Sequence, residues 1–194
     1  MARAMGEQGL RVTGIDRCLS MLRIARRNAP KARLFLADAR GFSVARPHQA
    51  GVCTFNSLAH FHSPEELSRV FTSVRAALCP LAPFLFDLTM EEGYLRRWHG
   101  TFELTAEGLV CTVRPSYDAL TRLARNEVVV FRREGATKTD DGAQKRFTIL
   151  QKCHNRQEVV SALRGSGFSA IDVLDAVRDL GISGDFGRCF FLAT

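Results

Sequence analysis

Acidic and amide side chains stand at the ends of four short hydrophobic segments in the first half of the chain. They are Asp16, Asp38, Asn56 and Asp87. A carboxylate carries two oxygens that accept hydrogen bonds, so Asp16 and Asp38 could bind a diol or an amino group. If the four segments are parallel strands, their carboxyl ends lie at one edge of a sheet, where open α/β folds bind ligands. The spacing therefore predicts a binding site built from strand ends.

The segments around these residues alternate between strand and helix patterns. Strands are predicted over residues 10–15, 32–37, 51–55 and 83–88, and helices over residues 2–9, 18–28 and 63–78. The last of these helices begins with Ser63, Pro64 and Glu66, which form an N-terminal capping pattern. Because strands separated by helices pair in parallel, the alternation predicts an α/β fold with a doubly wound, mainly parallel sheet.

The pattern changes after Trp98, where strands follow one another without helices. Strands are predicted over residues 101–114, 126–134 and 144–152, with a polar hairpin loop over residues 135–142. A capping box of Asn155 and Glu158 then opens a helix that ends near residue 165, and strands over residues 169–174 and 189–193 close the chain. We expect a single domain over residues 1–194, with an antiparallel insertion over residues 101–152.

The composition limits the class of protein. The chain has 194 residues, of which 46% are hydrophobic and 24% charged, as in one globular domain. No apolar run has the roughly 20 residues of a membrane helix, and the first residues lack an apolar signal segment. The six cysteines form no zinc-spaced cluster. We therefore predict free thiols, no metal site, no membrane contact and a cytoplasmic protein.

The net charge of +7 is compatible with binding to nucleic acid. The densest basic stretch lies over residues 23–33, and no aromatic side chains alternate with its arginines. A surface that binds single-stranded nucleic acid usually combines both kinds of side chain. We interpret the stretch as a solvated helix face, and nucleic acid is not an expected partner.

The ordered strand ends resemble those of the class I S-adenosylmethionine-dependent methyltransferases. The resemblance covers roughly residues 2–90, and it includes Gly14-Ile15-Asp16, Ala37-Asp38-Ala39, Phe55-Asn56-Ser57 and Phe84-Leu85-Phe86-Asp87. It implies a Rossmann-like methyltransferase sheet, an enzyme that transfers methyl groups, and S-adenosylmethionine as the cofactor.

The resemblance also implies roles for single residues. Asp16 would accept hydrogen bonds from the ribose hydroxyls, although it also suits a helix N-cap, and Arg17 beside it is a further cofactor-binding candidate. Asp38 would accept from the adenine amino group, and the Ala39 N–H would donate to an adenine ring nitrogen. Met21 would pack on the adenine ring or simply fill the core. Phe55 and Asn56 would line the floor near the methionine end of the cofactor.

The family's first strand and Gly-x-Gly loop would precede the helix with which this chain opens, and no residue before Met1 is present to form them. We therefore expect a truncated domain, from an internal start codon or from a degenerate relative. The strands ending at Asp16 and Phe55 would then lose a shared partner. The turn over residues 79–83 keeps a proline but lacks the glycines that are usual in the family.

The antiparallel insertion resembles that of small-molecule N-methyltransferases of the amino-sugar and glycine type. This resemblance implies a small-molecule acceptor methylated at nitrogen or oxygen, and an insertion that covers the active site or forms a homodimer. If the acceptor arrives protonated, a base is needed. The candidates are His60, His154 and Asp87, of which His60 is preferred. The two histidines are equally explained as cap or loop residues, and Asp87 as a turn former.

Two other functions share the same core. A nucleic-acid methyltransferase fits the basic charge, but the Asn-Pro-Pro-Tyr type of motif is missing after Phe55. A non-catalytic, degenerate interaction protein would explain the missing glycine loop, although it would need neither Asp16 nor Asp38.

Overall fold

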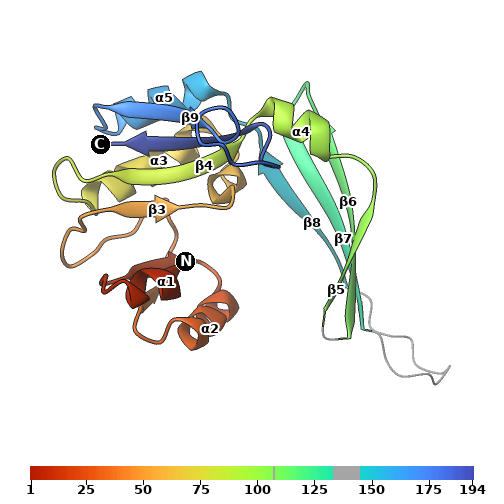
Figure 1. The fold of residues 1–194 in the computed structure, drawn as a ribbon, viewed down its shortest axis with the longest axis horizontal. Coiled ribbons are helices and arrows are strands. Elements are labelled where there is room, and N and C mark those ends of the chain that lie inside the picture. Colours follow the sequence, from red (N-terminus) through yellow and green to blue (C-terminus); the bar gives the residue numbers. More distant parts are fainter. Residues whose placement is uncertain (107, 133–144) are drawn as a thin grey trace.

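The computed structural model describes residues 1–106, 108–132 and 145–194. Its elements form three parts (Figure 1). The N-terminal unit comprises α1 (Ala2–Glu7), β1 (Thr13–Asp16), α2 (Leu19–Asn28) and β2 (Arg33–Leu36). The central body comprises β3 (Gly51–Cys53), the short 3₁₀ helix η1 (Ser57–His60), α3 (Pro64–Ala76), β4 (Phe84–Thr89), α5 (Arg156–Gly165), β9 (Ile171–Asp175) and β10 (Arg188–Ala193).

The third part is the antiparallel sheet. It comprises β5 (Phe102–Ala106), β6 (Leu109–Asp118), β7 (Leu123–Arg132) and β8 (Lys145–Lys152), and α4 (Glu91–Arg97) connects it to the body. Its strands pair in the order β5-β6-β7-β8, all antiparallel. The prediction of an antiparallel insertion is confirmed. Residues 101–114 fold as two strands of a hairpin, however, where the sequence suggested one, and α4 was not predicted.

The predicted parallel sheet is present in two pieces. In the N-terminal unit β1 pairs with β2 in parallel, and in the central body the order is β3-β4-β10-β9. The β3–β4 pair is parallel, whereas β10 is antiparallel to both of its neighbours. Among the described strands, β1 and β3 each pair with a single neighbour, so each has one edge without a strand.

Local sequence signals set both helices of the body. The Ser63 side chain accepts a hydrogen bond from the Glu66 N–H, and Pro64 occupies the first turn of α3. Asn155 and Glu158 form a reciprocal capping box at the start of α5. Both predicted helix starts are confirmed. The hairpin loop predicted over residues 135–142 lies outside the described residues.

The hydrophobic core lies between the body's sheet and the pair α3 and α5. Its aromatic part is a group of ring contacts among residues of α3, β4 and β10 and one residue after α5: Phe71, Phe84, Phe86, Phe191 and Phe168. The apolar stripes of the two helices cover these rings. This packing fixes the strand ends of β3 and β4, which carry much of the candidate site.

Candidate functional site

Asp16 and Asp38 lie at the same end of two paired strands. Asp16 ends β1, and its backbone C=O accepts from the Ala37 N–H of the chain leaving β2 (3.1 Å). The strands are parallel and in register, with Asp16 opposite Leu36. The expected placement at the carboxyl ends of adjacent parallel strands is confirmed. The expectation that both carboxylates line one pocket stays a prediction. One Asp16 oxygen accepts from the Cys18 N–H (2.7 Å), which caps the chain ahead of α2.

The carboxylate of Asp38 is held by Arg40. Asp38 Oδ1 accepts from the Arg40 N–H (2.9 Å), and Oδ2 accepts from its Nη2 (2.6 Å). The hydrogen bonds from the guanidinium lower the pKa of Asp38 to about 2, so this carboxylate stays charged at neutral pH. The Ala39 N–H donates to no acceptor within the described residues.

Two further predicted residues flank these carboxylates. Arg17 is exposed, and its charge contributes to lowering the pKa of both Asp38 and His60. That shared influence places Asp38 and His60 within electrostatic range of one cation. Met21 is 53% exposed on α2. It is therefore free to pack on a ligand, and the alternative that it fills the core is wrong.

A strained turn follows β3. Phe55 and Asn56 both adopt left-handed backbone conformations, with φ of 64° and 57°. Asp87 holds this turn, because its Oδ1 accepts from the Phe55 N–H (2.7 Å) and its Oδ2 from the Asn56 N–H (2.9 Å). The turn leaves the Phe55 ring 78% exposed at the sheet edge.

Asp87 itself is completely buried and also pairs with Arg188 (2.9 Å). Both of its oxygens accept hydrogen bonds and neither is exposed, so the carboxylate holds the turn in this structure. Its role as a proton acceptor stays a prediction. The sequence could not show the contact with the turn, since Asp87 and Phe55 are 32 positions apart.

Asn56 is 7% exposed, and its side-chain amide joins three elements. Its Oδ1 accepts from the Thr89 N–H (2.9 Å) at the end of β4. Its Nδ2 donates to the Tyr94 hydroxyl on α4 (3.0 Å) and to Gln151 Oε1 on β8 (3.4 Å). Asn56 therefore fixes the antiparallel sheet against the body, and sequence reasoning missed Tyr94 and Gln151.

His60 and His62 converge on one backbone carbonyl. His60 Nδ1 lies 3.2 Å from the Leu150 oxygen, and His62 Nε2 lies 3.3 Å from the same atom. His60 is an exposed residue. Its imidazole is nevertheless partly desolvated, and this desolvation lowers its pKa below the usual value. A neutral imidazole at the protein surface can accept a proton at neutral pH.

His154, the third predicted base, has a different environment. It is 1% exposed, and its Nε2 lies 2.7 Å from the Phe61 carbonyl oxygen. Burial lowers the pKa of His154. Because this buried ring contacts the Phe61 carbonyl, it braces the segment that follows His60, and its catalytic role stays a prediction.

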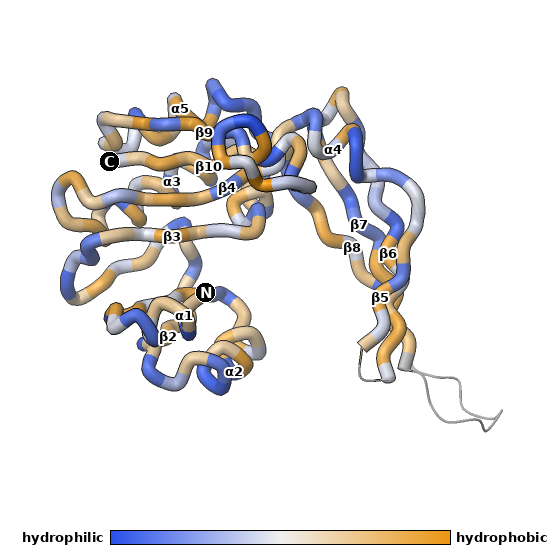
Figure 2. The backbone as a smooth tube through the Cα atoms, in the orientation of Figure 1, coloured by the Kyte–Doolittle hydropathy of each residue, from blue (hydrophilic) through white to orange (hydrophobic). Residues whose placement is uncertain are grey.

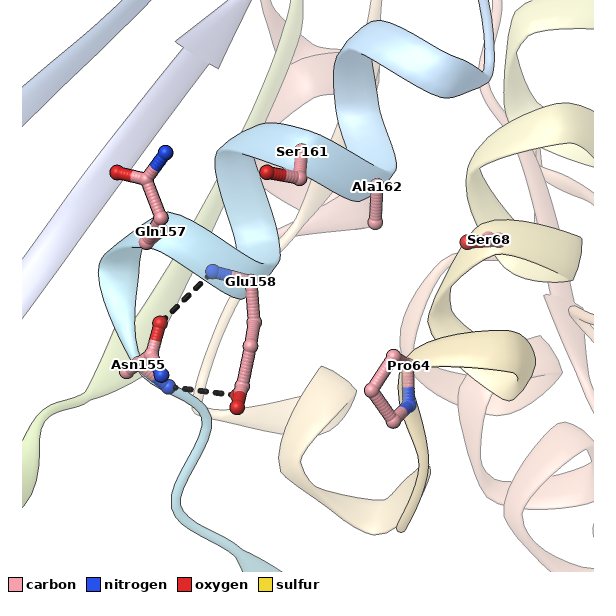
Figure 3. Close-up of a pocket in the computed structure, with 7 residues that line it drawn as sticks. All are labelled: Pro64, Ser68, Asn155, Gln157, Glu158, Ser161 and Ala162. Carbon is pink, nitrogen blue, oxygen red and sulfur yellow. Dashed lines mark hydrogen bonds between the residues drawn. The ribbon is translucent and has the colours of Figure 1, made fainter.

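An open groove of about 430 Å³ lies between the first turns of α3 and α5 (Figure 3). Pro64 and Ser68 line one side, and Asn155, Gln157 and Glu158 line the other. A smaller cavity of about 170 Å³ lies beside the start of α4, and His154 lines it. Neither contains the strand-end carboxylates. Within the described residues no cluster of side chains could hold a metal ion.

The sequence of residues 1–81 matches the model of a methyltransferase domain family. A curated relative is the dTDP-3-amino-3,6-dideoxy-alpha-D-glucopyranose N,N-dimethyltransferase of Streptomyces fradiae, 33% identical over 89 residues. The match covers 43% of this chain, and the chain spans about a third (35%) of that relative.

Solved structures share the fold over nearly the whole chain. A S-adenosylmethionine-dependent methyltransferase from Clostridium acetobutylicum superimposes with a TM-score of 0.76 at 15% identity, covering 95% of this chain and 75% of that one. The amino pentose methyltransferase CalS10 of Micromonospora echinaspora gives 0.71 at 20% identity, covering 95% and 73%. The resemblance to the class I S-adenosylmethionine-dependent methyltransferases is therefore confirmed, in the sequence of residues 1–81 and in the fold.

Proposed function

We propose that this protein binds S-adenosylmethionine and transfers its methyl group to a small molecule, at nitrogen or oxygen. The observation that carries the proposal is the pair Asp16 and Asp38, at the ends of paired parallel strands in a chain with the methyltransferase fold. Ligands bind at such strand ends in open α/β sheets.

The residues present fit the adenosine half of this cofactor. Asp16 has one oxygen engaged by Cys18, and its other oxygen is available to a ribose diol. Asp38 is charged, and the neighbouring Ala39 N–H has no acceptor among the residues that the structure describes. A carboxylate acceptor beside an N–H donor matches the amino group and ring nitrogen of adenine. Met21 and Phe55 supply exposed apolar surface.

When bound, S-adenosylmethionine supplies an electrophilic methyl group on sulfur. The chain's own contribution is position. Asp87 fixes the Phe55–Asn56 turn, and Asn56 fixes α4 and β8 around the acceptor side. His60 is the group suited to take a proton from the acceptor, because it is exposed and its lowered pKa keeps it neutral at neutral pH.

An amino sugar is the acceptor class that we propose. The support comes from the curated relative, an N,N-dimethyltransferase of an amino sugar nucleotide, and from the similar fold of an amino pentose methyltransferase. A nucleic-acid methyltransferase and a non-catalytic binding protein are the alternatives. Within the described residues no helix has the length and hydrophobicity to cross a membrane. The cytoplasmic location stays a prediction, in line with the six free cysteines.

The experiment pairs a binding and an activity measurement. Calorimetry with S-adenosylhomocysteine should show binding to the wild-type chain and weaker binding to Asp16→Asn. Methyl transfer from labelled S-adenosylmethionine should then be measured on amino sugars, on RNA and on DNA. Transfer to nucleic acid would replace the small-molecule proposal. Binding without transfer to any acceptor would favour a non-catalytic protein, and no binding would overturn the proposal.

We further propose that the antiparallel sheet joins two copies of the chain. Directly paired residues of antiparallel strands share a face, so the register defines an apolar face that includes Phe102, Leu104, Leu109 and Phe147. These four side chains are 47%, 58%, 42% and 49% exposed. Figure 2 shows hydrophobic residues continuing along β5 and β6 away from the body.

The charges on this apolar face favour a second copy as the occupant. Arg132 and Lys145 stand at its far end, and the acidic Glu103 and Glu127 lie on the opposite face. Two copies in opposite directions would bury the apolar side chains and keep their cationic ends apart. Light scattering should give a dimer for the wild type and a monomer for Leu104→Lys. The matched variant Thr105→Lys, on the opposite face, should remain dimeric, and a wild-type monomer would overturn the proposal.

A further inference from the structure

Arg40 lies between two carboxylates from different parts of the molecule. Its Nη2 and Nε donate to Asp38, just beyond β2, and its Nη1 donates to Glu66, in the first turn of α3. Its guanidinium carbon also lies 5.9 Å from the centre of the Phe61 ring. Arg40 therefore contacts both the strand end that would hold adenine and the segment that leads into α3.

Glu66 extends this contact toward the histidines. Its second oxygen accepts from the His62 N–H (2.7 Å). The His62 ring in turn shares the Leu150 carbonyl with His60. A continuous series of polar contacts thus runs from Asp38 through Arg40 and Glu66 to the segment that carries both imidazoles.

The environment of this series differs from that of an ordinary surface ion pair. The side chains of Arg40 and Glu66 are 30% and 29% exposed, and the guanidinium contacts two carboxylates and an aromatic face at once. A planar guanidinium with several N–H donors holds its carboxylate partners in a fixed geometry, whereas a single exposed ion pair does not. The ion pair also joins two parts whose strands do not pair with each other.

We propose that Arg40 is a positioning residue that couples the cofactor end of the site to the segment bearing His60 and His62. The coupling rests on the proposed function, since it concerns binding at Asp38. A ligand that forms a hydrogen bond with Asp38 changes the position of the Arg40 guanidinium, because the same carboxylate accepts hydrogen bonds from it. The guanidinium fixes Glu66, and Glu66 fixes the His62 backbone. Arg40 touches neither the reacting atoms nor the acceptor in this scheme.

The test compares four variants of the full chain: Arg40→Met, Arg40→Lys, Glu66→Gln and the control Arg46→Met, which removes an exposed arginine from the same connection between β2 and β3. Calorimetry measures the affinity for S-adenosylhomocysteine. NMR of the imidazole protons, assigned through His60→Gln and His62→Gln, measures how far the same ligand shifts the two histidines.

We expect Arg40→Met to weaken S-adenosylhomocysteine binding by roughly three- to tenfold, as for loss of one partly buried polar contact. It should also abolish the ligand-induced shift of the histidine signals. Arg40→Lys should restore part of the affinity, because it keeps the charge without the planar guanidinium. Glu66→Gln should keep most of the affinity and lose the histidine response. Arg46→Met should match the wild type in both.

Two outcomes would overturn the coupling alone. One is a wild-type histidine response in Arg40→Met. The other is a wild-type response in Glu66→Gln, which would show that the path does not pass through Glu66. A wild-type chain that binds no S-adenosylhomocysteine would overturn the proposed function and the coupling with it, so the two failures are distinguishable.

Discussion

The N-terminal unit and the central body each contain a parallel strand pair, but the strands β2 and β4 of these pairs are buried to very different extents. In β4 of the body, Phe84, Phe86 and Leu88 are 2%, 0% and 1% exposed. In β2 of the N-terminal unit, Phe35 and Leu36 are 54% and 60% exposed. Parallel strands are normally covered on both faces. The residues that would bind adenosine therefore stand on the less packed part, and those that shape the acceptor side stand on the better packed part.

Because the two parts are packed differently, we expect the stability of the fold and the affinity for the ligand to depend on different residues. Substitutions in the body should act mainly on folding, whereas substitutions in the N-terminal unit should act mainly on ligand affinity. The link between the two parts runs through Arg40 and Glu66 and through Ala39, which packs against the body's core. A bound cofactor would add contacts to the N-terminal unit and stabilise it.

The largest expected effect comes from adding a strand beside the open edges of β1 and β3. An engineered N-terminal extension with one apolar strand and a glycine-rich turn should pair with the open edges of β1 and β3. We expect the extended chain to bind S-adenosylhomocysteine tighter by orders of magnitude, because several hydrogen bonds to charged groups contribute about 1.5–3 kcal/mol each. Calorimetry and thermal melts of both chains provide the measurement. Equal affinity and equal melting temperature would show that this chain already has a complete site.

A matched pair of phenylalanines tests the difference in packing. Phe86→Ala should cost about 3–5 kcal/mol of unfolding free energy, since the ring is fully buried among other rings. Phe35→Ala should change the unfolding free energy by less than about 1 kcal/mol, because its ring is largely exposed. Urea unfolding followed by circular dichroism gives both values. Similar losses in the two variants would mean that β2 is packed as firmly as β4.

The sequence predicted those features that depend on neighbouring residues. The caps at Ser63 and Asn155 involve residues three positions apart, and both helices begin where expected. The positions of Asp16 and Asp38 follow from strand periodicity, and they lie at the carboxyl ends of two paired strands, Asp16 as the last residue of β1 and Asp38 just beyond β2. Such signals are local, so they are visible without a fold.

The features that were missed depend on contacts between distant positions. Asp87 reaches the turn at Phe55 across 32 positions, and Arg40 reaches Glu66 across 26. The sequence placed Asp87 at a strand end, which is correct, but gave no sign that the turn would occupy both of its oxygens. Helix α4 has only seven residues, too few to show a clear periodic pattern.

Substituting one carboxylate in each part tests whether S-adenosylhomocysteine binds at the N-terminal unit. Asp16→Asn should weaken S-adenosylhomocysteine binding by about 10- to 100-fold, because a neutral amide offers one acceptor oxygen in place of two. Its effect on the melting temperature should be small. Asp172→Asn, which changes an exposed carboxylate on β9, should leave the affinity unchanged. Equal affinities in both variants would remove Asp16 from the binding site.

The smallest expected effect is the pH dependence of the stability of the central body. Burial is the main reason that the pKa of His154 is lowered, and nearby Lys152 and His62 lower it further, whereas the Phe61 carbonyl and Glu158 act in the opposite direction. The folded state therefore disfavours the protonated ring. The stability that neutral His154 provides is complete above the unfolded pKa of about 6.5 and decreases as the pH falls below it.

The melting temperature of the wild type should accordingly fall between pH 7 and pH 5.5. The variant His154→Gln keeps an N–H that can donate to the Phe61 carbonyl and has no group that titrates in this range, so its melting temperature should depend less on pH. His60→Gln serves as the matched comparison, because the pKa of His60 is also lowered but its ring is exposed at the surface. If His60→Gln removed more of the pH dependence than His154→Gln, the surface ring would be the one that limits stability in acid. The attraction of Glu158, whose Oε2 lies 3.9 Å from His154 Nδ1, would then offset the cost of burying a protonated His154 ring.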